Sequence, residues 1–68
     1  MVGSLGLNLR VLRFKLNKQQ YKVAEELGIS VRTLSRYEKD QVIPNKIMIK
    51  KLADYYGVTL QQLTEEDL

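Results

Sequence analysis

Apolar side chains recur along this chain at intervals of three and four residues, the spacing of a helix face, and no stretch alternates as a strand does. Helix-breaking residues interrupt the pattern at Gly28, Pro44 and Gly57. Residues suited to helix N-caps stand at Ser4, Asn17, Ser30, Asn45 and Thr59. The pattern predicts five short helices: residues 5–16, 20–27 and 31–39, one that follows Asn45 and ends at Gly57, and a last one opened by Thr59.

The first predicted helix carries two apolar stripes. The inner stripe, which we expect to face the core, comprises Leu5, Leu9, Leu12 and Leu16. A second stripe lies almost opposite, so the same core does not receive both. We call it the outer stripe and expect the chain termini or another subunit to cover it; it comprises Leu7, Val11 and Phe14.

The other predicted helices each carry one apolar face. In the second and third helices this face comprises Val23, Ala24, Leu27, Leu34 and Tyr37. In the last two helices it comprises Ile49, Leu52, Ala53, Tyr56, Leu60 and Leu63. Thr59 and Gln62 match the capping-box pattern at the start of the last helix. These faces together predict a compact all-α bundle of five helices.

The composition narrows the range of functions. At 68 residues the chain has room for a single domain, residues 1–68. It contains no cysteine and no histidine, which excludes disulfides, thiolate or imidazole metal sites and a histidine general base. No apolar run is long enough to cross a bilayer, and the start of the chain lacks the basic region of a signal peptide. We therefore expect a cytoplasmic binding module with no membrane contact, cofactor, metal or small-molecule substrate, and not an enzyme.

Charge is divided unevenly along the chain. Residues 1–51 hold all eleven lysines and arginines against four acids, a balance of +7, whereas residues 52–68 hold four acids and no base, a balance of −4. A basic region of this kind favours a polyanion such as nucleic acid, although small soluble domains also carry uneven charge by chance. We expect the acidic last helix to lie away from the phosphates.

Residues 20–39 meet the requirements of a helix-turn-helix. Two short helices are joined by a turn of about four residues. Ala24 is small enough to let the second helix cross closely, and Gly28 can take the positive φ of the turn. Ile29 follows as an apolar plug. These residue types are common, so an ordinary helical hairpin is the alternative at this point.

The chain resembles the XRE family of helix-turn-helix domains, which includes phage Cro proteins and phage repressors. The resemblance covers about residues 5–63, without a gap between Gln20 and Pro44. It rests on Leu12, Arg13, Gln20, the segments VAEELGIS (23–30) and TLSRYE (33–38), Pro44, Leu52, Ala53, the segment GVT (57–59) and Leu63. It implies the lambda-repressor-like five-helix fold, with the second and third helices as the DNA-reading unit.

The resemblance assigns base reading to one face of the third helix. That face comprises Val31, Arg32, Thr33, Ser35 and Arg36. Because arginine pairs with guanine O6 and N7, we expect Arg32 or Arg36 to read a guanine. Thr33 and Ser35 can bond bases or phosphates. Val31 either packs on a thymine methyl group or fills the interface between the helices.

Contacts with the DNA backbone are expected around this helix. The resemblance places Gln20 where a glutamine braces a phosphate and supports the recognition helix, with a plain surface glutamine as the alternative. Asn45 should leave N–H groups of the fourth helix open to a phosphate. The expected set is Gln19, Gln20, Lys22, Lys39, Asn45 and Lys46, with Lys15 and Lys50 as further candidates. The alternative for each lysine is a solvated surface side chain.

Arg13 and Glu38 match a pair that, in the family, forms a partly buried salt bridge between the first and third helices. Arg13 borders the inner stripe at Leu9 and Leu12, which agrees with such a position. Because a buried charge without its partner is costly, we expect the loss of either residue to destabilise the fold more than the loss of a surface pair does.

Several positions depart from the family pattern. Gln19 replaces the usual Ser or Thr N-cap, Lys18 stands where an apolar residue is common, and Asp40 where glycine is usual. The loop carries Val42 and Ile43 in place of basic residues. These two residues weaken the expectation of phosphate contacts from the loop and favour a protein interface there.

The sequence therefore predicts a transcription regulator that binds double-stranded DNA as a homodimer on a palindromic operator. A minimal, Cro-like repressor fits the short chain, although the resemblance does not decide between a repressor and an activator. The alternative is an antitoxin or regulator module whose main role is to bind a protein, such as a toxin or an antagonist, through the outer stripe or the Val42–Ile43 loop. A fragment of a longer regulator is also compatible with this sequence.

Overall fold

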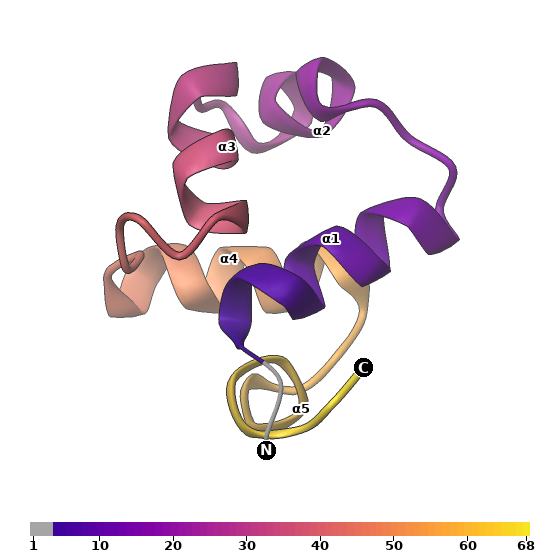
Figure 1. The fold of residues 1–68 in the computed structure, drawn as a ribbon, viewed down its shortest axis with the longest axis vertical. Coiled ribbons are helices and arrows are strands. Elements are labelled where there is room, and N and C mark those ends of the chain that lie inside the picture. Colours follow the sequence, from indigo (N-terminus) through magenta and orange to yellow (C-terminus); the bar gives the residue numbers. More distant parts are fainter. Residues whose placement is uncertain (1–3) are drawn as a thin grey trace.

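The computed structural model describes residues 4–68 as five helices joined by short turns (Figure 1). These are α1 (Leu5–Lys15), α2 (Gln20–Leu27), α3 (Val31–Glu38), α4 (Lys46–Tyr56) and α5 (Leu60–Glu65). The predicted all-α fold is confirmed, and α1 and α3 each end one residue earlier than the sequence pattern indicates. Within residues 4–68, no helix has the length and apolar character needed to span a membrane.

Local capping fixes where most of the helices begin and end. Four helices follow a residue whose side chain accepts a hydrogen bond from the N–H three residues on, at 2.8–3.0 Å: Ser4, Ser30, Asn45 and Thr59. The N–H of Thr59 also donates to Oε1 of Gln62, which completes the predicted capping box. α2 is the exception, because Gln19 forms no such side-chain bond. α2 and α4 end at Gly28 and Gly57, whose φ angles are 74° and 71°.

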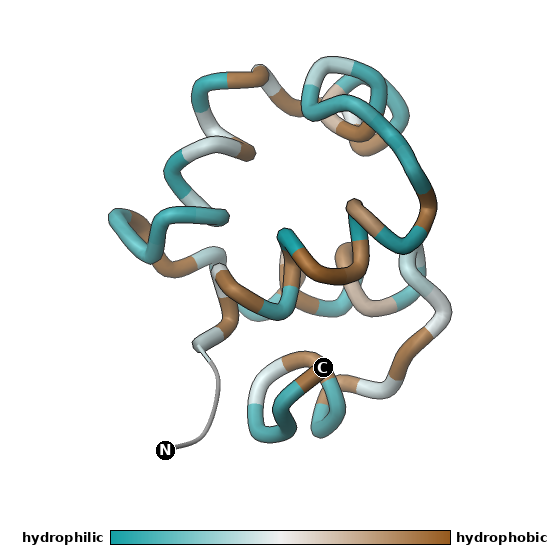
Figure 2. The backbone as a smooth tube through the Cα atoms, turned by 45° about the vertical axis from the view of Figure 1, so that its right-hand side comes forward, coloured by the Kyte–Doolittle hydropathy of each residue, from teal (hydrophilic) through white to brown (hydrophobic). Residues whose placement is uncertain are grey.

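The core receives apolar side chains from every helix. Its buried members are Leu9, Leu12, Val23, Ala24, Leu27, Leu34, Leu52, Ala53 and Leu63. α3 packs against α1 and α2, while α5 packs against α1 and α4. α2 and α3 therefore lie on one side of α1 and α4, and α5, with the acidic residues 65–67 at its end, lies on the other (Figure 1). Apolar and polar stretches alternate along the tube in Figure 2, as amphipathic helices require.

Three sequence expectations about individual residues are wrong. Leu16 is 48% exposed, because α1 ends at Lys15 and the chain turns away from the core. Leu60 is 46% exposed, so only Leu63 brings α5 into the core. Asn17 does not cap a helix but lies in the turn after α1, with a positive φ of 56°.

The outer stripe of α1 is not covered by residues 4–68. Leu7 and Phe14 are 44% and 65% exposed, and Val11 is half-buried. The C-terminal segment therefore does not cover this stripe, and the expected cover by the N-terminus concerns residues 1–3, which lie outside the described residues.

A buried asparagine that the sequence did not single out fastens α5 to α1. Asn8 is only 1% exposed. Its Nδ2 donates to the carbonyl oxygens of Leu63 and Glu66 at 2.8 and 2.7 Å, and its Oδ1 accepts the N–H of Leu68 at 3.1 Å. These three hydrogen bonds hold the chain after α5 against α1.

Candidate nucleic-acid interface

A left-handed glycine and a serine cap build the turn between α2 and α3. Gly28 ends α2 with a φ of 74°, and the N–H of Ile29 donates to the carbonyl oxygen of Ala24 at 3.0 Å. The Ile29 side chain is half-buried against the core. Ser30 then opens α3, because its Oγ accepts the N–H of Thr33 at 3.0 Å. Residues 20–38 therefore have helix-turn-helix geometry rather than that of an ordinary hairpin.

α3 has one buried face and one open face. Leu34 and Glu38 are 0% and 1% exposed, so they turn toward the interior. Tyr37, which the pattern placed in the core, is only half-buried. The open face carries the residues predicted to read bases: Val31, Arg32 and Arg36 are exposed, and Thr33 and Ser35 are half-buried.

The structure narrows the roles that the sequence left open for two residues on this face. Val31 is 43% exposed, so it does not fill the interface between the helices. The hydroxyl of Thr33 accepts a hydrogen bond from the Ser30 hydroxyl at 2.9 Å. Because a hydroxyl also carries its own hydrogen, Thr33 can still donate one hydrogen bond outward.

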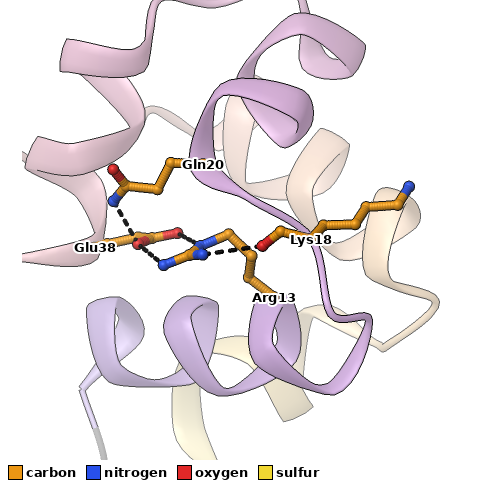
Figure 3. Close-up of polar contacts among 4 residues, drawn as sticks. All are labelled: Arg13, Lys18, Gln20 and Glu38. Carbon is orange, nitrogen blue, oxygen red and sulfur yellow. Dashed lines mark hydrogen bonds and ion pairs between the residues drawn. The ribbon is translucent and has the colours of Figure 1, made fainter.

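A buried ion pair fixes α3 to α1 (Figure 3). Arg13 donates through Nε to Oε2 of Glu38 at 2.8 Å and through Nη2 to Oε1 at 3.1 Å. Its Nη1 donates to the carbonyl oxygen of Lys18 at 3.0 Å. The side chains of Arg13 and Glu38 are 11% and 2% exposed, so solvent screens this pair little.

Gln20 joins the same network from α2. Its Nε2 donates to Oε1 of Glu38 at 2.9 Å, and the residue is half-buried (Figure 3). Gln20 is therefore not a plain surface glutamine, because it holds the first residue of α2 against the last residue of α3. Its amide group has a second hydrogen that this contact does not use.

The residues predicted to contact phosphates lie on several elements around α3. The lysines of this set are exposed: Lys22 on α2, Lys39 directly after α3, and Lys46 at the start of α4. Gln19 is also exposed, and its side chain does not cap α2. Lys15, a further candidate, is exposed at the end of α1.

Asn45 and Lys50 differ from the expectation. The Oδ1 of Asn45 accepts the N–H of Met48 at 2.8 Å, so this side chain occupies one of the N–H groups expected to be open to a phosphate. The Nζ of Lys50 lies 3.0 Å from both carboxylate oxygens of Asp54. Lys50 is thus already paired within α4.

Lys18, at a position where the family usually has an apolar residue, belongs to a polar cluster on the surface. Its Nζ lies 2.8 Å from Oε1 of Glu26 and 3.2 Å from the Tyr55 hydroxyl, which itself donates to Glu26 at 2.5 Å. The hydrogen bond with Glu26 raises the pKa of Lys18, and the same bond lowers the pKa of Glu26. Burial raises the pKa of Tyr55. The cluster connects the α1–α2 turn with α2 and α4.

Apolar side chains are exposed in the loop after α3 and on the first turn of α4. Val42 and Ile43 in the loop are 45% and 82% exposed, and Ile47 on the first turn of α4 is 81% exposed. The sequence analysis identified Val42 and Ile43 but not Ile47. Ile47 falls within the predicted fourth helix, and helical spacing does not show whether a neighbouring element covers a side chain. We call these three residues the loop patch.

Comparison with known proteins places the chain in a family. A family model described as Helix-turn-helix matches residues 9–63. The HTH-type transcriptional regulator ImmR of Bacillus subtilis (strain 168) is 36% identical over 64 residues, which cover 94% of this chain and 50% of ImmR. The cryptic phage CTXphi transcriptional repressor RstR of Vibrio cholerae is 33% identical over 58 residues, which cover 85% of this chain and 52% of RstR. The chain spans about half the length of these curated relatives.

Solved structures confirm the fold. The P22 c2 repressor, crystallised in complex with a synthetic operator, superposes with a TM-score of 0.88 at 23% identity, covering 96% of this chain and 98% of that one. The solution structure of the SOS-response transcriptional repressor LexA from Eubacterium rectale gives a TM-score of 0.85 at 29% identity, covering 91% of this chain and 66% of that one.

Proposed function

The chain belongs to the XRE family of helix-turn-helix domains, and from this premise we propose that it is a DNA-binding transcription regulator that acts as a repressor. The observation that carries the proposal is the exposure of Arg32 and Arg36 on α3, whose opposite face is fixed by the buried Glu38. The role requires no catalytic residue, cofactor or metal. We therefore propose a single cytoplasmic binding domain without enzymatic activity.

In the proposed complex, α3 enters the major groove with its open face toward the bases. Arg32 and Arg36 then meet guanine O6 and N7, which arginine binds through two parallel hydrogen bonds. Val31 packs on a thymine methyl group, since it is exposed rather than buried. Ser35, and Thr33 through its free hydroxyl hydrogen, bond bases or phosphates.

The residues around α3 hold the phosphates on either side of the groove. The exposed lysines of α2, of the turn after α3 and of α4 supply positive charge: Lys22, Lys39 and Lys46. Gln19, and Gln20 through its second amide hydrogen, donate to phosphate oxygens. Asn45 contributes by shaping the first turn of α4, whose remaining N–H groups can receive a phosphate.

We further propose that two copies bind one palindromic operator. A single short recognition helix buries too little DNA surface for tight, specific binding, whereas two copies on adjacent half-sites double the contact. The two relatives, a regulator and a repressor, are each about twice as long as the region that matches this chain.

A salt titration with duplex DNA of random sequence tests phosphate binding. We expect the logarithm of the affinity to fall steeply with the logarithm of salt concentration, and each substitution of Lys22, Lys39 or Lys46 by alanine to reduce the slope by about 0.9. Lys18→Ala is the matched control, because the Nζ of Lys18 already bonds Glu26 and Tyr55. A slope near zero in the unaltered protein contradicts the proposal.

A second function is favoured by the loop patch. The loop patch places three exposed large apolar side chains, Val42, Ile43 and Ile47, within six consecutive residues, and exposed apolar groups of this kind are typical of a surface that binds another protein. Under this alternative the main partner is a toxin or an antagonist encoded beside this protein. The DNA titration then gives a flat salt response, and the Ile47→Lys variant loses the protein partner.

A further inference from the structure

A contact between the start of α1 and the end of α3 lies where the sequence departs from the family pattern. Asp40, which stands where glycine is usual, has a left-handed backbone with φ of 58°. Its Oδ1 accepts the N–H of Gly6 at 2.9 Å. That N–H is in the first turn of α1, where no partner within the helix is available, so the carboxylate of Asp40 supplies the missing acceptor.

Gly6 allows the two helices to approach this closely. A Cβ at this position would lie 2.7 Å from the carbonyl oxygen of Glu38, and 2.8 Å from both the carbonyl oxygen of Tyr37 and Oδ2 of Asp40. Two of these three atoms belong to the backbone, which has little freedom to move aside. The first turn of α1 therefore rests directly on the last turn of α3.

α3 is held at three points along its length. The Ser30 cap fixes its first turn, and the Arg13–Glu38 pair fixes its buried face. The Gly6–Asp40 contact fixes the residues that directly follow it. Arg36 lies in the last turn, and its carbonyl oxygen accepts the N–H of Gln41 at 3.0 Å, so the placement of the residues after α3 bears directly on Arg36.

We propose that Asp40 is a positioning residue, which sets the orientation of the last turn of α3 through Gly6 and thereby the reach of Arg36. The inference rests on the proposed DNA-binding function. Contacts with bases require exact placement, whereas attraction to phosphates depends mainly on charge. Loss of the Gly6–Asp40 contact should therefore weaken binding to the specific site more than binding to random DNA.

Two substitutions of equal charge isolate this hydrogen bond. Both glycine and asparagine tolerate a positive φ, but only asparagine retains a side-chain oxygen that can accept the Gly6 N–H. Asp40→Asn is thus the reference for Asp40→Gly, and both remove the same negative charge. Glycine takes this backbone conformation without strain, so the variant is expected to fold.

The experiment first selects the preferred duplex from a random library with the wild type. It then compares each variant's affinity for that duplex with its affinity for random duplex DNA, at a temperature where both variants are folded. We expect the ratio of the two affinities to be about fivefold lower in D40G than in D40N, the size expected from the loss of one hydrogen bond. Hydrogen exchange of the Gly6 amide should be slow in the wild type and D40N and fast in D40G.

Equal ratios in the two variants would overturn the positioning role, even if D40G melts at a lower temperature. Fast exchange of Gly6 in the wild type would overturn the contact itself, and this measurement needs no variant. A wild-type protein that prefers no duplex sequence would contradict the proposed DNA-binding function itself, and this outcome differs from equal ratios in the two variants.

Discussion

Two nitrogens of Arg13, Nε and Nη2, bond the two carboxylate oxygens of Glu38 separately, at 2.8 and 3.1 Å, inside the molecule. The same carboxylate also accepts from Gln20, so α1, α2 and α3 meet at one buried anion. A buried carboxylate requires such partners, since without them its desolvation is not offset. The orientation of α3, and with it that of its open face, therefore depends on this buried network.

Removal of this carboxylate should be costly. We expect Glu38→Ala to lower the free energy of unfolding by about 3 kcal/mol, because the guanidinium of Arg13 is left buried without its partner. Urea unfolding measures the change. Asp54→Ala is the control, since it breaks the exposed pair with Lys50 and should cost no more than about 0.5 kcal/mol. Similar losses in the two variants would contradict a structural role for the buried pair.

Arg36 should determine the preference at one base pair. We expect Arg36→Ala to reduce discrimination at that position by about 1–3 kcal/mol while its unfolding transition stays close to that of the wild type. Competition binding with operators changed one base pair at a time measures this. Arg10→Ala removes an equal charge from an exposed position on α1 and should weaken all duplexes alike. If Arg36→Ala also weakened binding to all duplexes by the same factor, Arg36 would not read a base.

Asn8 should control the docking of α5. Asn8→Ala removes three hydrogen bonds at a buried site, and we expect the free energy of unfolding to fall by about 2 kcal/mol. Hydrogen exchange should become faster in residues 60–68 than in α2 and α3, because the lost bonds lie on the α5 side. If hydrogen exchange in residues 60–68 stayed as slow as in the wild type, the packing of Leu63 alone would be enough to dock α5.

The Lys18–Glu26 contact makes a part of the stability depend on pH. The hydrogen bond from Lys18 lowers the pKa of Glu26 below the ordinary value of 4.5. The stability that ionised Glu26 contributes is therefore present above pH 4.5 and is lost as the pH falls through the lower pKa of the folded state. The pKa of Lys18 is raised above 10.5, so its contribution is present below that value and is lost as the pH rises through the folded pKa.

We therefore expect the wild type to be more stable than Glu26→Gln at pH 7, with a difference that shrinks toward pH 3. The effect should be small, because both side chains are exposed to screening by solvent. Urea midpoints across this pH range measure it, and Glu25→Gln, which removes the same charge one residue earlier, is the control. A difference that grows on acidification would contradict the assigned contact.

Features set by near neighbours in the sequence were predictable. Ser4 accepts the N–H of Leu7 and Thr59 accepts that of Gln62, in both cases three residues on, so the sequence alone places the starts of α1 and α5. Contacts between distant residues were not predictable from periodicity. Asp40 meets Gly6 across 34 positions, and such a contact exists only once α1 and α3 have packed together.

In the candidate site, too, features set by near neighbours were predictable and contacts between distant residues were not. The open face of α3 could be read from Arg32 and Arg36, because helical spacing places them away from Leu34. The Arg13–Glu38 pair, 25 positions apart, was suggested by family resemblance rather than by spacing. The exposure of Ile47 was not foreseen, since spacing does not reveal whether a neighbouring element covers a side chain.

Selection from a library of random duplexes tests sequence-specific base reading by α3. We expect an enriched palindromic motif with half-sites spaced about 10 base pairs apart, and a guanine in each half-site whose preference disappears when Arg32 or Arg36 is replaced by alanine. Recovery of no preferred sequence by the folded wild-type protein, or of one that both arginine variants retain in full, would contradict base reading by α3.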